Sequence, residues 1–356
     1  MKNFLKILLI LVCSIVILAV LFIGYLTLTE YRPAAISVAS VTDGAEKKSI
    51  AIGDALRLVS FNTGYSGLDK TQDFFMDGGK RSKPESRQEV EDNTEAICSF
   101  LKEQNADIYL LQEVDVDSDR SFNVNQYQRY QSGLGLYGAI GYNYYCDFVP
   151  IPLPPMGKVR SGIVTLSGFD PYSSERITLP NPFSWPVRIA NLKRCLLIQR
   201  IPLEGSEKML VIINLHLEAY DDGDGRARQT AMLLALMEAE REQGNYVIAG
   251  GDFNQTFEGA GTFSMAKTGF FVPSILKNSE LPEGFSYAFD AQVPSCRSLA
   301  TAYTGDKTNM DFYIIDGFIV SDNISVDSVK TIDLDFANSD HNPVAMSVTL
   351  KTQEEN

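Results

Sequence analysis

The stretch Ala249-Gly250-Gly251-Asp252-Phe253-Asn254 carries the most specific chemical motif of this chain of 356 residues. The run at 245–250 predicts a strand. Because two glycines let the backbone turn tightly after that strand, Asp252 and Asn254 can project into one site. A carboxylate there can orient or deprotonate an attacking water, and the amide can hold that water or a phosphate oxygen. An Asx-type turn, which Gly-Asp-x-Asn also favours, explains the segment equally well.

The chain has only two histidines, and each lies in a short polar motif. His216 ends the apolar run Ile212-Ile213-Asn214-Leu215, and His341 lies in Ser339-Asp340-His341-Asn342-Pro343. Imidazole has a pKa near neutrality, so it suits proton transfer and contact with phosphate. A single histidine at the end of an apolar run is more often structural. Because carboxylates occur in the neighbouring motifs, we interpret both histidines as functional.

Two predicted strands end on side chains that could bind a metal ion. Asn62 ends the strand expected at 56–62, and Glu113 ends a buried-type strand at 107–113. Mg²⁺ prefers oxygen ligands and accepts few protein carboxylates beside bound waters and phosphate. Glu113 is therefore predicted to be the principal ligand. From its position alone, a strand-end acid in water would be the more common arrangement.

Asp316 interrupts the apolar stretch 313–320. A carboxylate in such a strand is costly to bury without a partner. His341 is the obvious candidate, since an Asp–His pair fixes the imidazole tautomer and favours its protonated form. An exposed edge position for Asp316 is the alternative.

The pattern of short strands with interspersed helices predicts a layered α/β sandwich rather than a single parallel sheet. Helices are expected at about 86–104 and 225–243, where apolar residues recur among charged ones. Further strands are expected at 139–149, 162–167, 192–203, 209–217, 312–321 and 343–350. We predict one domain at 55–351 without an internal boundary, followed by a tail at 352–356.

The N-terminal segment predicts a membrane anchor. Lys2 and Lys6 precede an uncharged stretch from Ile7 to Leu28, which is long enough to cross the hydrocarbon layer as a helix. The charge distribution favours a cytoplasmic N-terminus. We therefore expect an uncleaved anchor at 1–29 and a linker at 30–54, with the domain on the extracellular side of the cell membrane. A cleaved signal peptide is the rival interpretation.

Composition narrows the function further. The apolar fraction of 45% is that of a globular protein, and the net charge is −14. Such a surface repels polyanions, so long nucleic acid is disfavoured as a partner, although basic groups could line one cleft. The cysteines form no CxxC pair and show no metal-ligand spacing. We expect free thiols, with two disulfides as the alternative, among the four outside the anchor: Cys98, Cys146, Cys195 and Cys296.

The motifs described above, in their order along the chain, resemble the endonuclease/exonuclease/phosphatase superfamily, the DNase I-like proteins. This superfamily includes DNase I, abasic-site endonucleases, inositol-polyphosphate 5-phosphatases and neutral sphingomyelinases. The resemblance covers about 56–350, and its specific feature is the combination of GDFN and SDHNP with an upstream QE. It implies a four-layer sandwich of two mainly antiparallel β-sheets flanked by helices. Here one transmembrane helix would precede the sandwich, in a membrane-anchored member of bacterial type.

The resemblance also implies a role for each matching residue. Asn62, Glu113 and Asp340 would form a metal site for Mg²⁺, with Mn²⁺ or Ca²⁺ as alternatives. Asp252 and Asn254 would position the nucleophilic water.

The histidines and two arginines complete the predicted site. Asp316 would support His341, and His216 matches the extra histidine of the DNase I and sphingomyelinase branches, with no carboxylate partner assigned. Arg160 resembles a phosphate-contacting arginine of DNase I. Arg297 is a second candidate for contact with the substrate phosphate.

The implied activity is Mg²⁺-dependent hydrolysis of a phosphate ester, of phosphodiesterase or nuclease type, with water as the nucleophile. We expect a monomer acting on the outer side of the membrane. Two alternatives stay open. One is a catalytically inactive surface binding domain of the same fold, and the other is a phosphomonoesterase acting on phosphorylated small molecules or lipid head groups.

Overall fold

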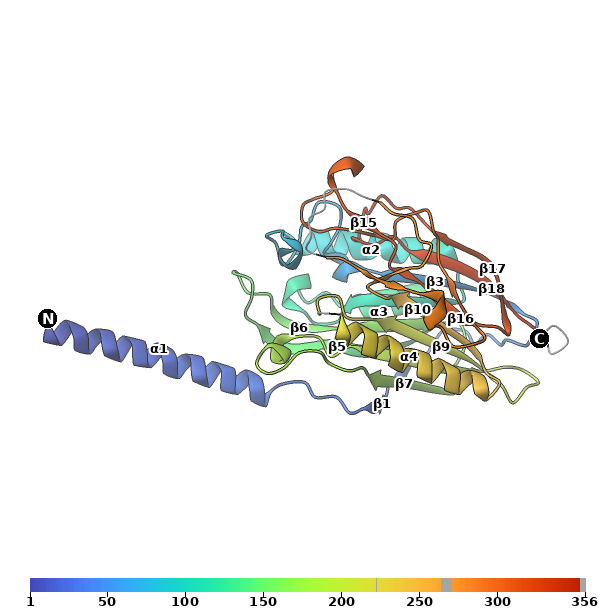
Figure 1. The fold of residues 1–356 in the computed structure, drawn as a ribbon, viewed down its shortest axis with the longest axis horizontal. Helices are drawn as coiled ribbons and strands as arrows, with labels where there is room; N and C mark the ends of the chain where they lie inside the picture. Colours follow the sequence, from blue (N-terminus) through green and yellow to red (C-terminus); the bar gives the residue numbers. More distant parts are fainter. Residues whose placement is uncertain (222, 264–270, 353–356) are drawn as a thin grey trace.

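The computed structural model describes residues 1–221, 223–263 and 271–352, and two seven-stranded β-sheets form its centre (Figure 1). The first sheet has the order β1-β7-β8-β9-β10-β16-β13. Its strands are β1 (Ile36–Val38), β7 (Ser173–Thr178), β8 (Cys195–Pro202), β9 (Met209–His216), β10 (Tyr246–Asp252), β16 (Asp316–Ser321) and β13 (Phe285–Ala288).

The second sheet has the order β17-β18-β3-β4-β6-β5-β2. Its strands are β17 (Ile324–Thr331), β18 (Val344–Leu350), β3 (Ala55–Asn62), β4 (Ile108–Asp115), β6 (Gly157–Ser167), β5 (Tyr137–Val149) and β2 (Val41–Thr42). Each sheet has one parallel pair, β9 with β10 and β3 with β4, and its other pairs are antiparallel. Two small ladders join β11 (Gln255–Phe257) to β12 (Ser274–Leu276) and β14 (Cys296–Arg297) to β15 (Phe312–Tyr313).

Alternation along the central strands builds three apolar layers. In β9, Leu210 and Ile212 pack between the two sheets, whereas Val211 and Ile213 face α4 (Asp224–Glu242). On the second sheet, Val59 and Phe61 pack against α2 (Arg87–Gln104), and α3 (Gln126–Leu134) lies beside α2. Successive strand residues point to opposite faces, which is why both faces of each central strand are apolar. The predicted four-layer sandwich of two mainly antiparallel sheets flanked by helices is confirmed.

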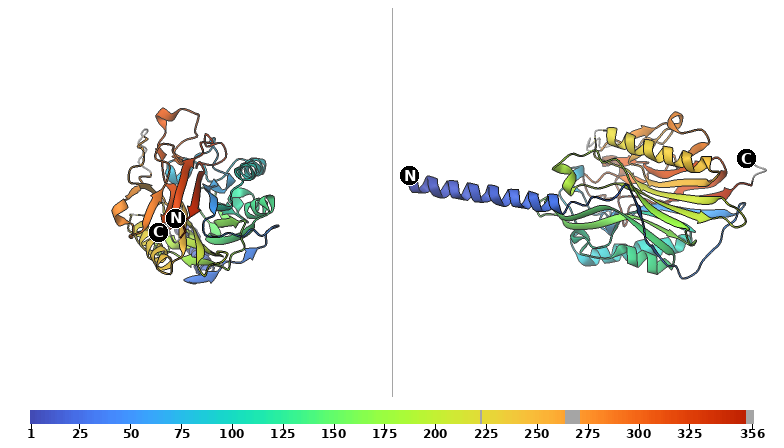
Figure 2. Two further views of the ribbon diagram at one scale, coloured as in Figure 1. Left: turned by 90° about the vertical axis from the view of Figure 1, so that its right-hand side faces the viewer. Right: turned by 90° about the horizontal axis from the view of Figure 1, so that it is seen from below.

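Helix α1 (Lys2–Leu28) projects away from the sandwich (Figure 2). Within the described part of the chain, it is the one helix long and apolar enough to cross a membrane, by length and composition. At 1.5 Å per residue its 27 residues extend for about 40 Å.

Three features differ from the expectation. The stretch 30–54, predicted as a linker, adds β1 to β7 of the first sheet and β2 to β5 of the second. These strands are too short to give a periodic signal in the sequence. The expected strand 312–321 is split into β15 and β16, and α3, β7 and β17 were not predicted. Residues 353–356 of the predicted tail lie outside the described residues.

Candidate active site

A cavity of about 420 Å³ opens where the central strands of both sheets end. Seven of the predicted residues line it: Glu113, His216, Asp252, Asn254, Arg297, Asp340 and His341. Asn62 and Asp316 lie directly behind them, since Asn62 contacts Asp252 and Asp316 contacts His341. The structure therefore brings nine of the ten predicted residues together, all but Arg160, and their chemical roles stay predictions.

Strand alternation explains why four of these side chains meet. Each lies an even number of residues along its strand from an apolar residue that packs between the sheets, as Asn62 does from Leu58 on β3. The four are Asn62, His216, Asp252 and Asp316. Each side chain therefore points into the space between the sheets rather than toward a helix layer. The parallel register of β9 and β10 then sets His216 directly opposite Asp252.

The glycines of the central motif lie within β10 rather than after it. Gly251 has φ +147°, and a Cβ on it would lie 2.0 Å from the carbonyl oxygen of Leu215 on β9. A side chain at this position would therefore collide with the backbone of the neighbouring strand. Glycine is required here for close strand approach, and this approach holds Asp252 beside β9.

Both interpretations of the Gly-Asp-x-Asn segment apply. Oδ1 of Asp252 accepts the backbone N–H of Asn254 at 2.9 Å, which is an Asx turn, and Asn254 has φ 51°. Oδ2 of the same carboxylate faces the cavity. It accepts a hydrogen bond from Nδ2 of Asn62 at 3.0 Å and lies 3.3 Å from Nε2 of His216 and 3.7 Å from Nε2 of His341. Asp252 is therefore the carboxylate partner of His216, which could not be assigned from the sequence.

Asp316 and His341 form a buried ion pair. Nδ1 of His341 lies 2.8 Å from Oδ2 of Asp316, and the two side chains are 6% and 1% exposed. Asp316 is thus a core strand residue and not an edge residue. The pair leaves Nε2 of His341 directed at the cavity, where Asn62, Asp252 and Asp340 surround it.

The electrostatics assign different protonation states to the two histidines. Burial opposes the charge of His341, but the carboxylates around it, Asp316 above all, raise its pKa well above 6.5. Burial and the positive charges of Arg194 and His341 hold the pKa of His216 well below 6.5. His341 is therefore an imidazolium at neutral pH and His216 a neutral imidazole.

Two acids of the site, Asp252 and Asp340, have raised pKa values. Burial, followed by the charge of Asp316, raises the pKa of Asp252 to about 7, against the opposing effect of His341. Burial also raises the pKa of Asp340 to about 6, and the charge of Glu113 adds to that shift. Asp252 can consequently exchange a proton at physiological pH, which is what a general base needs.

Glu113 reaches the cavity through a β-bulge. Strict alternation would point it toward α2, but the register of β4 with β6 shifts between Leu111 and Val114, and Glu113 has φ 54°. A bulge re-aims a side chain in this way, and positive φ at a non-glycine residue is a strained conformation typical of functional sites. Oε1 of Glu113 then lies 3.4 Å from Nδ2 of Asn62.

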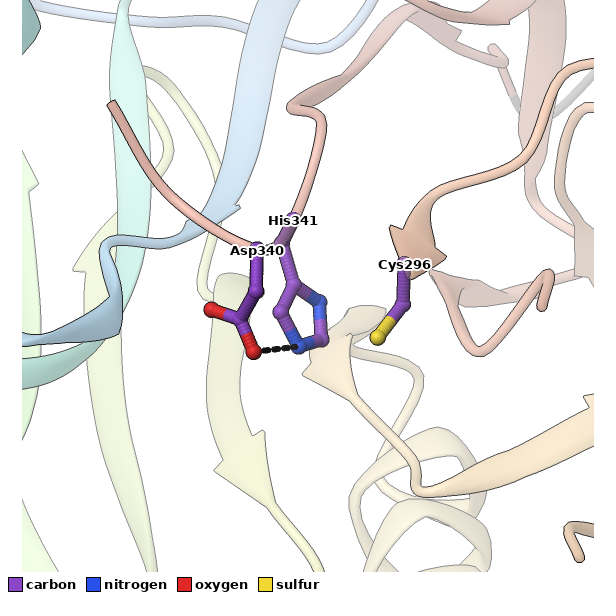
Figure 3. Close-up of side chains that lie close together, drawn as sticks. All are labelled: Cys296, Asp340 and His341. Carbon is purple, nitrogen blue, oxygen red and sulfur yellow. Dashed lines mark ion pairs between the residues drawn. The ribbon is translucent and has the colours of Figure 1, made fainter. Parts of the chain in front are cut away.

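The oxygen donors fit a hard divalent cation. Glu113 and Asp340 interact electrostatically across the cavity and supply carboxylate oxygens. Asn62 turns Nδ2 toward Glu113, while its amide oxygen Oδ1 accepts the backbone N–H of Gly64 at 3.1 Å. Figure 3 shows Asp340 and His341 with Cys296 close by, and Oδ2 of Asp340 lies 4.0 Å from Nε2 of His341. The thiol of Cys296, a softer ligand, was not predicted, and burial raises its pKa to about 12. All five cysteines are free, including the four outside α1 for which free thiols were expected.

The two predicted phosphate contacts differ from expectation. Arg160 lies outside the residues that line the cavity, because its neighbour Ser161 takes the cavity face of β6. The Arg160 guanidinium stacks on Tyr145 and pairs with Asp147. Arg297 does line the cavity, but its guanidinium donates to backbone carbonyl oxygens, including that of Asp69 at 2.7 Å.

Sequence reasoning missed two cationic side chains that line the cavity: Arg120, which pairs with Asp115 at 2.9 Å, and Arg194. Arg194 is 4% exposed and pairs with Glu218 at 3.5 Å. Its Nη1 has no hydrogen-bond partner among the residues that the structure describes. This N–H can donate to a phosphate oxygen, and Nε of Arg297 likewise has no hydrogen-bond partner among the described residues. Nothing in the local sequence Leu192-Lys193-Arg194 distinguishes Arg194 from an ordinary surface cation.

The chain belongs to the endonuclease/exonuclease/phosphatase family, whose model matches residues 59–341. The predicted family is thereby confirmed. No curated protein matches the sequence.

Solved structures share the fold. An endonuclease/exonuclease/phosphatase from Beutenbergia cavernae DSM 12333 is 18% identical with a TM-score of 0.57, over 83% of this chain and 72% of that chain. A functionally unknown conserved protein from Enterococcus faecalis V583 is 14% identical with a TM-score of 0.54, over 83% and 100%. The human Nocturnin catalytic domain with bound sulfate anion is 16% identical with a TM-score of 0.51, over 88% and 98%. At these identities the likeness concerns the fold.

Proposed function

We propose that this chain is a divalent-metal-dependent hydrolase of phosphate diesters that uses water as its nucleophile. The observation that carries the proposal is the convergence of Glu113 and Asp340 with His216, Asp252 and His341 on one cavity. Family membership supports the reaction class, and the catalytic positions described above are all filled by residues able to perform it.

Asp252 is the residue that would activate the water. Its Oδ1 is occupied by the N–H of Asn254, so Oδ2 is the oxygen available to take a proton from water. Its pKa of about 7 allows this transfer near neutral pH. The amide of Asn254 is held by the carbonyl oxygen of Leu217, which fixes the loop that carries both residues.

His341 would enter the reaction as an imidazolium. Asp316 occupies Nδ1, so the proton on Nε2 is the one that can be donated to a phosphoryl oxygen or to the departing alkoxide. Neutral His216 would donate a single hydrogen bond. Nη1 of Arg194, which has no hydrogen-bond partner among the described residues, adds a charged donor to the lining of the cavity.

Glu113, Asn62 and Asp340 would hold the cation, which when bound neutralises charge that develops on the phosphoryl oxygens. We expect Mg²⁺, with Mn²⁺ or Ca²⁺ as alternatives. Helix α1 would anchor the enzyme with its N-terminus in the cytoplasm and the sandwich, at 55–351, outside the cell.

The test is hydrolysis of bis(p-nitrophenyl) phosphate by the full chain in detergent micelles, with Mg²⁺, with excess EDTA, and after Mg²⁺ is restored. We expect activity that EDTA removes and Mg²⁺ restores. Glu113→Ala and His341→Ala should each abolish it, while Glu103→Ala, an exposed glutamate on α2, should not. A clear preference for p-nitrophenyl phosphate would favour the phosphomonoesterase alternative. No hydrolysis of either compound would favour the inactive binding domain.

A further inference from the structure

We propose that the substrate is a phospholipid of the bilayer in which α1 is anchored, and that the active site opens directly onto that bilayer. This inference rests on the proposed function, because it names the substrate class of the same site. Water would add to phosphorus as one P–O ester bond breaks, and the departing alcohol would take the proton. The products would be a phosphomonoester and an alcohol, one of which keeps the acyl chains.

The first support is the two-sided character of the cavity. Its inner end carries Glu113, Asp252, Asp340 and the histidines. Its outer walls are apolar and are formed by Met76, Val149, Ile151, Met156, Val187 and Leu192. A small, water-soluble phosphate ester would leave these walls uncovered. A phospholipid offers a phosphate diester for one end and hydrocarbon for the other.

The second support is the position of the anchor. The two segments that supply most of those apolar walls also hold the end of α1 against the domain. On the β5 side, Phe22 packs edge-to-face on Phe148 with ring centroids 5.8 Å apart. On the other side, Nε1 of Trp185 donates to Oγ1 of Thr27 at 3.2 Å. Figure 1 shows α1 and the connection between β5 and β6 leaving the domain at the same end.

Charged contacts hold the end of α1 against the domain. Glu30, just after α1, pairs with Arg188 at 3.1 Å and with Lys193 at 3.3 Å, and its carboxylate is only 2% exposed. Tyr31 then packs on Tyr145, with ring centroids 5.0 Å apart. The domain is therefore attached to its anchor with one defined face toward the membrane.

The depth of these contacts can be worked from the helix. If the hydrocarbon layer of about 30 Å begins at Ile7, where the uncharged stretch starts, it ends about 20 residues later, near Leu26. Phe22 lies four residues before that point, which is about 6 Å inside the layer. Phe148 packs on Phe22, so the end of β5 reaches the acyl boundary. This is the depth at which interfacial segments insert.

The exposed surface around the cavity mouth has the matching composition. Five apolar side chains protrude there, and we name them the membrane-facing rim: Met76, Ile151, Leu153, Trp185 and Val187. Leu153 is 89% exposed, which is costly in water and favourable in lipid. Trp185 is the only tryptophan of the sequence, and its indole is typical of the membrane–water interface.

A first measurement reads the orientation directly from Trp185. In proteoliposomes of phosphatidylcholine and phosphatidylglycerol, its fluorescence should be quenched by lipids that carry a nitroxide near the carbonyl end of the acyl chain. Iodide in the buffer should quench it at least threefold less than it quenches free tryptophan. Full quenching by iodide with none by the labelled lipid would overturn the proposed orientation.

The decisive test compares one variant on two substrates. Leu153→Glu adds charge to the rim at a residue that does not line the cavity. It should slow hydrolysis of the vesicle lipid to phosphomonoester and alcohol tenfold or more, while hydrolysis of bis(p-nitrophenyl) phosphate stays within twofold. The matched control is Tyr172→Glu, an exposed aromatic residue beside Arg200 at the opposite end of the sheet, which should change neither rate.

The outcomes separate this inference from the proposed function. If wild type hydrolyses the soluble diester but no vesicle lipid, or if Leu153→Glu hydrolyses lipid at the wild-type rate, the lipid substrate is refuted while the hydrolase is retained. If wild type hydrolyses neither compound, the proposed function itself fails.

Discussion

The Asp316–His341 pair gives the sharpest single prediction about the site, through the substitution Asp316→Asn. Oδ2 of Asp316 lies 2.8 Å from Nδ1 of His341, and both side chains are buried. Removing one partner of a buried ion pair typically costs about 3–5 kcal/mol. Because the asparagine oxygen can still accept the Nδ1–H, we expect the lower end, about 3 kcal/mol. Loss of the imidazolium should also lower kcat by about 10²- to 10⁴-fold.

The sign of the pH dependence distinguishes this mechanism from a general packing defect. A histidine with a raised folded pKa stabilises the protein fully below its unfolded value near 6.5, and this contribution is lost as pH rises through the folded value. The stability difference between wild type and Asp316→Asn should therefore be larger at pH 5.5 than at pH 9.

The assay is urea unfolding of the full chain in detergent micelles, followed by circular dichroism at both pH values, together with kcat on bis(p-nitrophenyl) phosphate. Asp327→Asn is the matched control, because Asp327 is exposed on β17 and bonds only to Thr349 among the described residues. It should change stability by less than about 0.5 kcal/mol. The reasoning would be refuted if Asp316→Asn had the same kcat as wild type, or if its loss of stability were equal at the two pH values.

Three further predictions concern the metal ligands, the base and the central glycine. Glu113→Gln should raise the Mg²⁺ concentration needed for half-maximal activity by about tenfold or more, measured by Mg²⁺ titration of the rate; an unchanged midpoint would exclude Glu113 as a ligand. Since Asp252 must be ionised to act as base, kcat/KM should fall about tenfold per pH unit below about pH 7, and a rate that is flat from pH 5 to 8 would exclude that role. Gly251→Ala should lower the free energy of unfolding in urea by more than about 4 kcal/mol, because its Cβ would meet the Leu215 carbonyl. Gly259→Ala, which is also at positive φ but in open space, should lower it by about 1–2 kcal/mol. Equal losses would contradict the close approach of β9 and β10.

Much of the site follows from the sequence because strand alternation is a local signal. The apolar residues of β3, β9, β10 and β16 share a parity with Asn62, His216, Asp252 and Asp316, so a correct strand assignment already points these side chains to one layer. The family motifs imply the four-layer sandwich and a role for each matching residue. Two histidines with four nearby carboxylates complete a recognisable chemical set.

The remainder depends on contacts between distant parts of the chain. The Asp252–His216 pairing comes from the parallel register of two strands, which no local pattern reveals. Glu113 reaches the cavity only through the bulge in β4. Arg194 is positioned by its ion pair with Glu218. The short strands β1 and β2 form because they pair with β7 and β5 at the edges of the two sheets.

The membrane-facing rim could not be predicted from the sequence either. Leu153 and Trp185 lie more than 30 residues apart in loops that carry no secondary-structure signal. Their common position beside α1 emerges only when the anchor is seated against the domain. The sequence predicts the anchor, but not the face of the domain that we propose it brings to the membrane.

We propose that residues from both sheets enclose one divalent cation beside His216 and His341. Anomalous diffraction from crystals of the full chain soaked with Mn²⁺ tests it most directly. We predict one peak within coordination distance of Glu113, shared with Asn62 or Asp340, and its loss in Glu113→Gln. Absence of a peak between these residues, with the fold intact, would contradict the account.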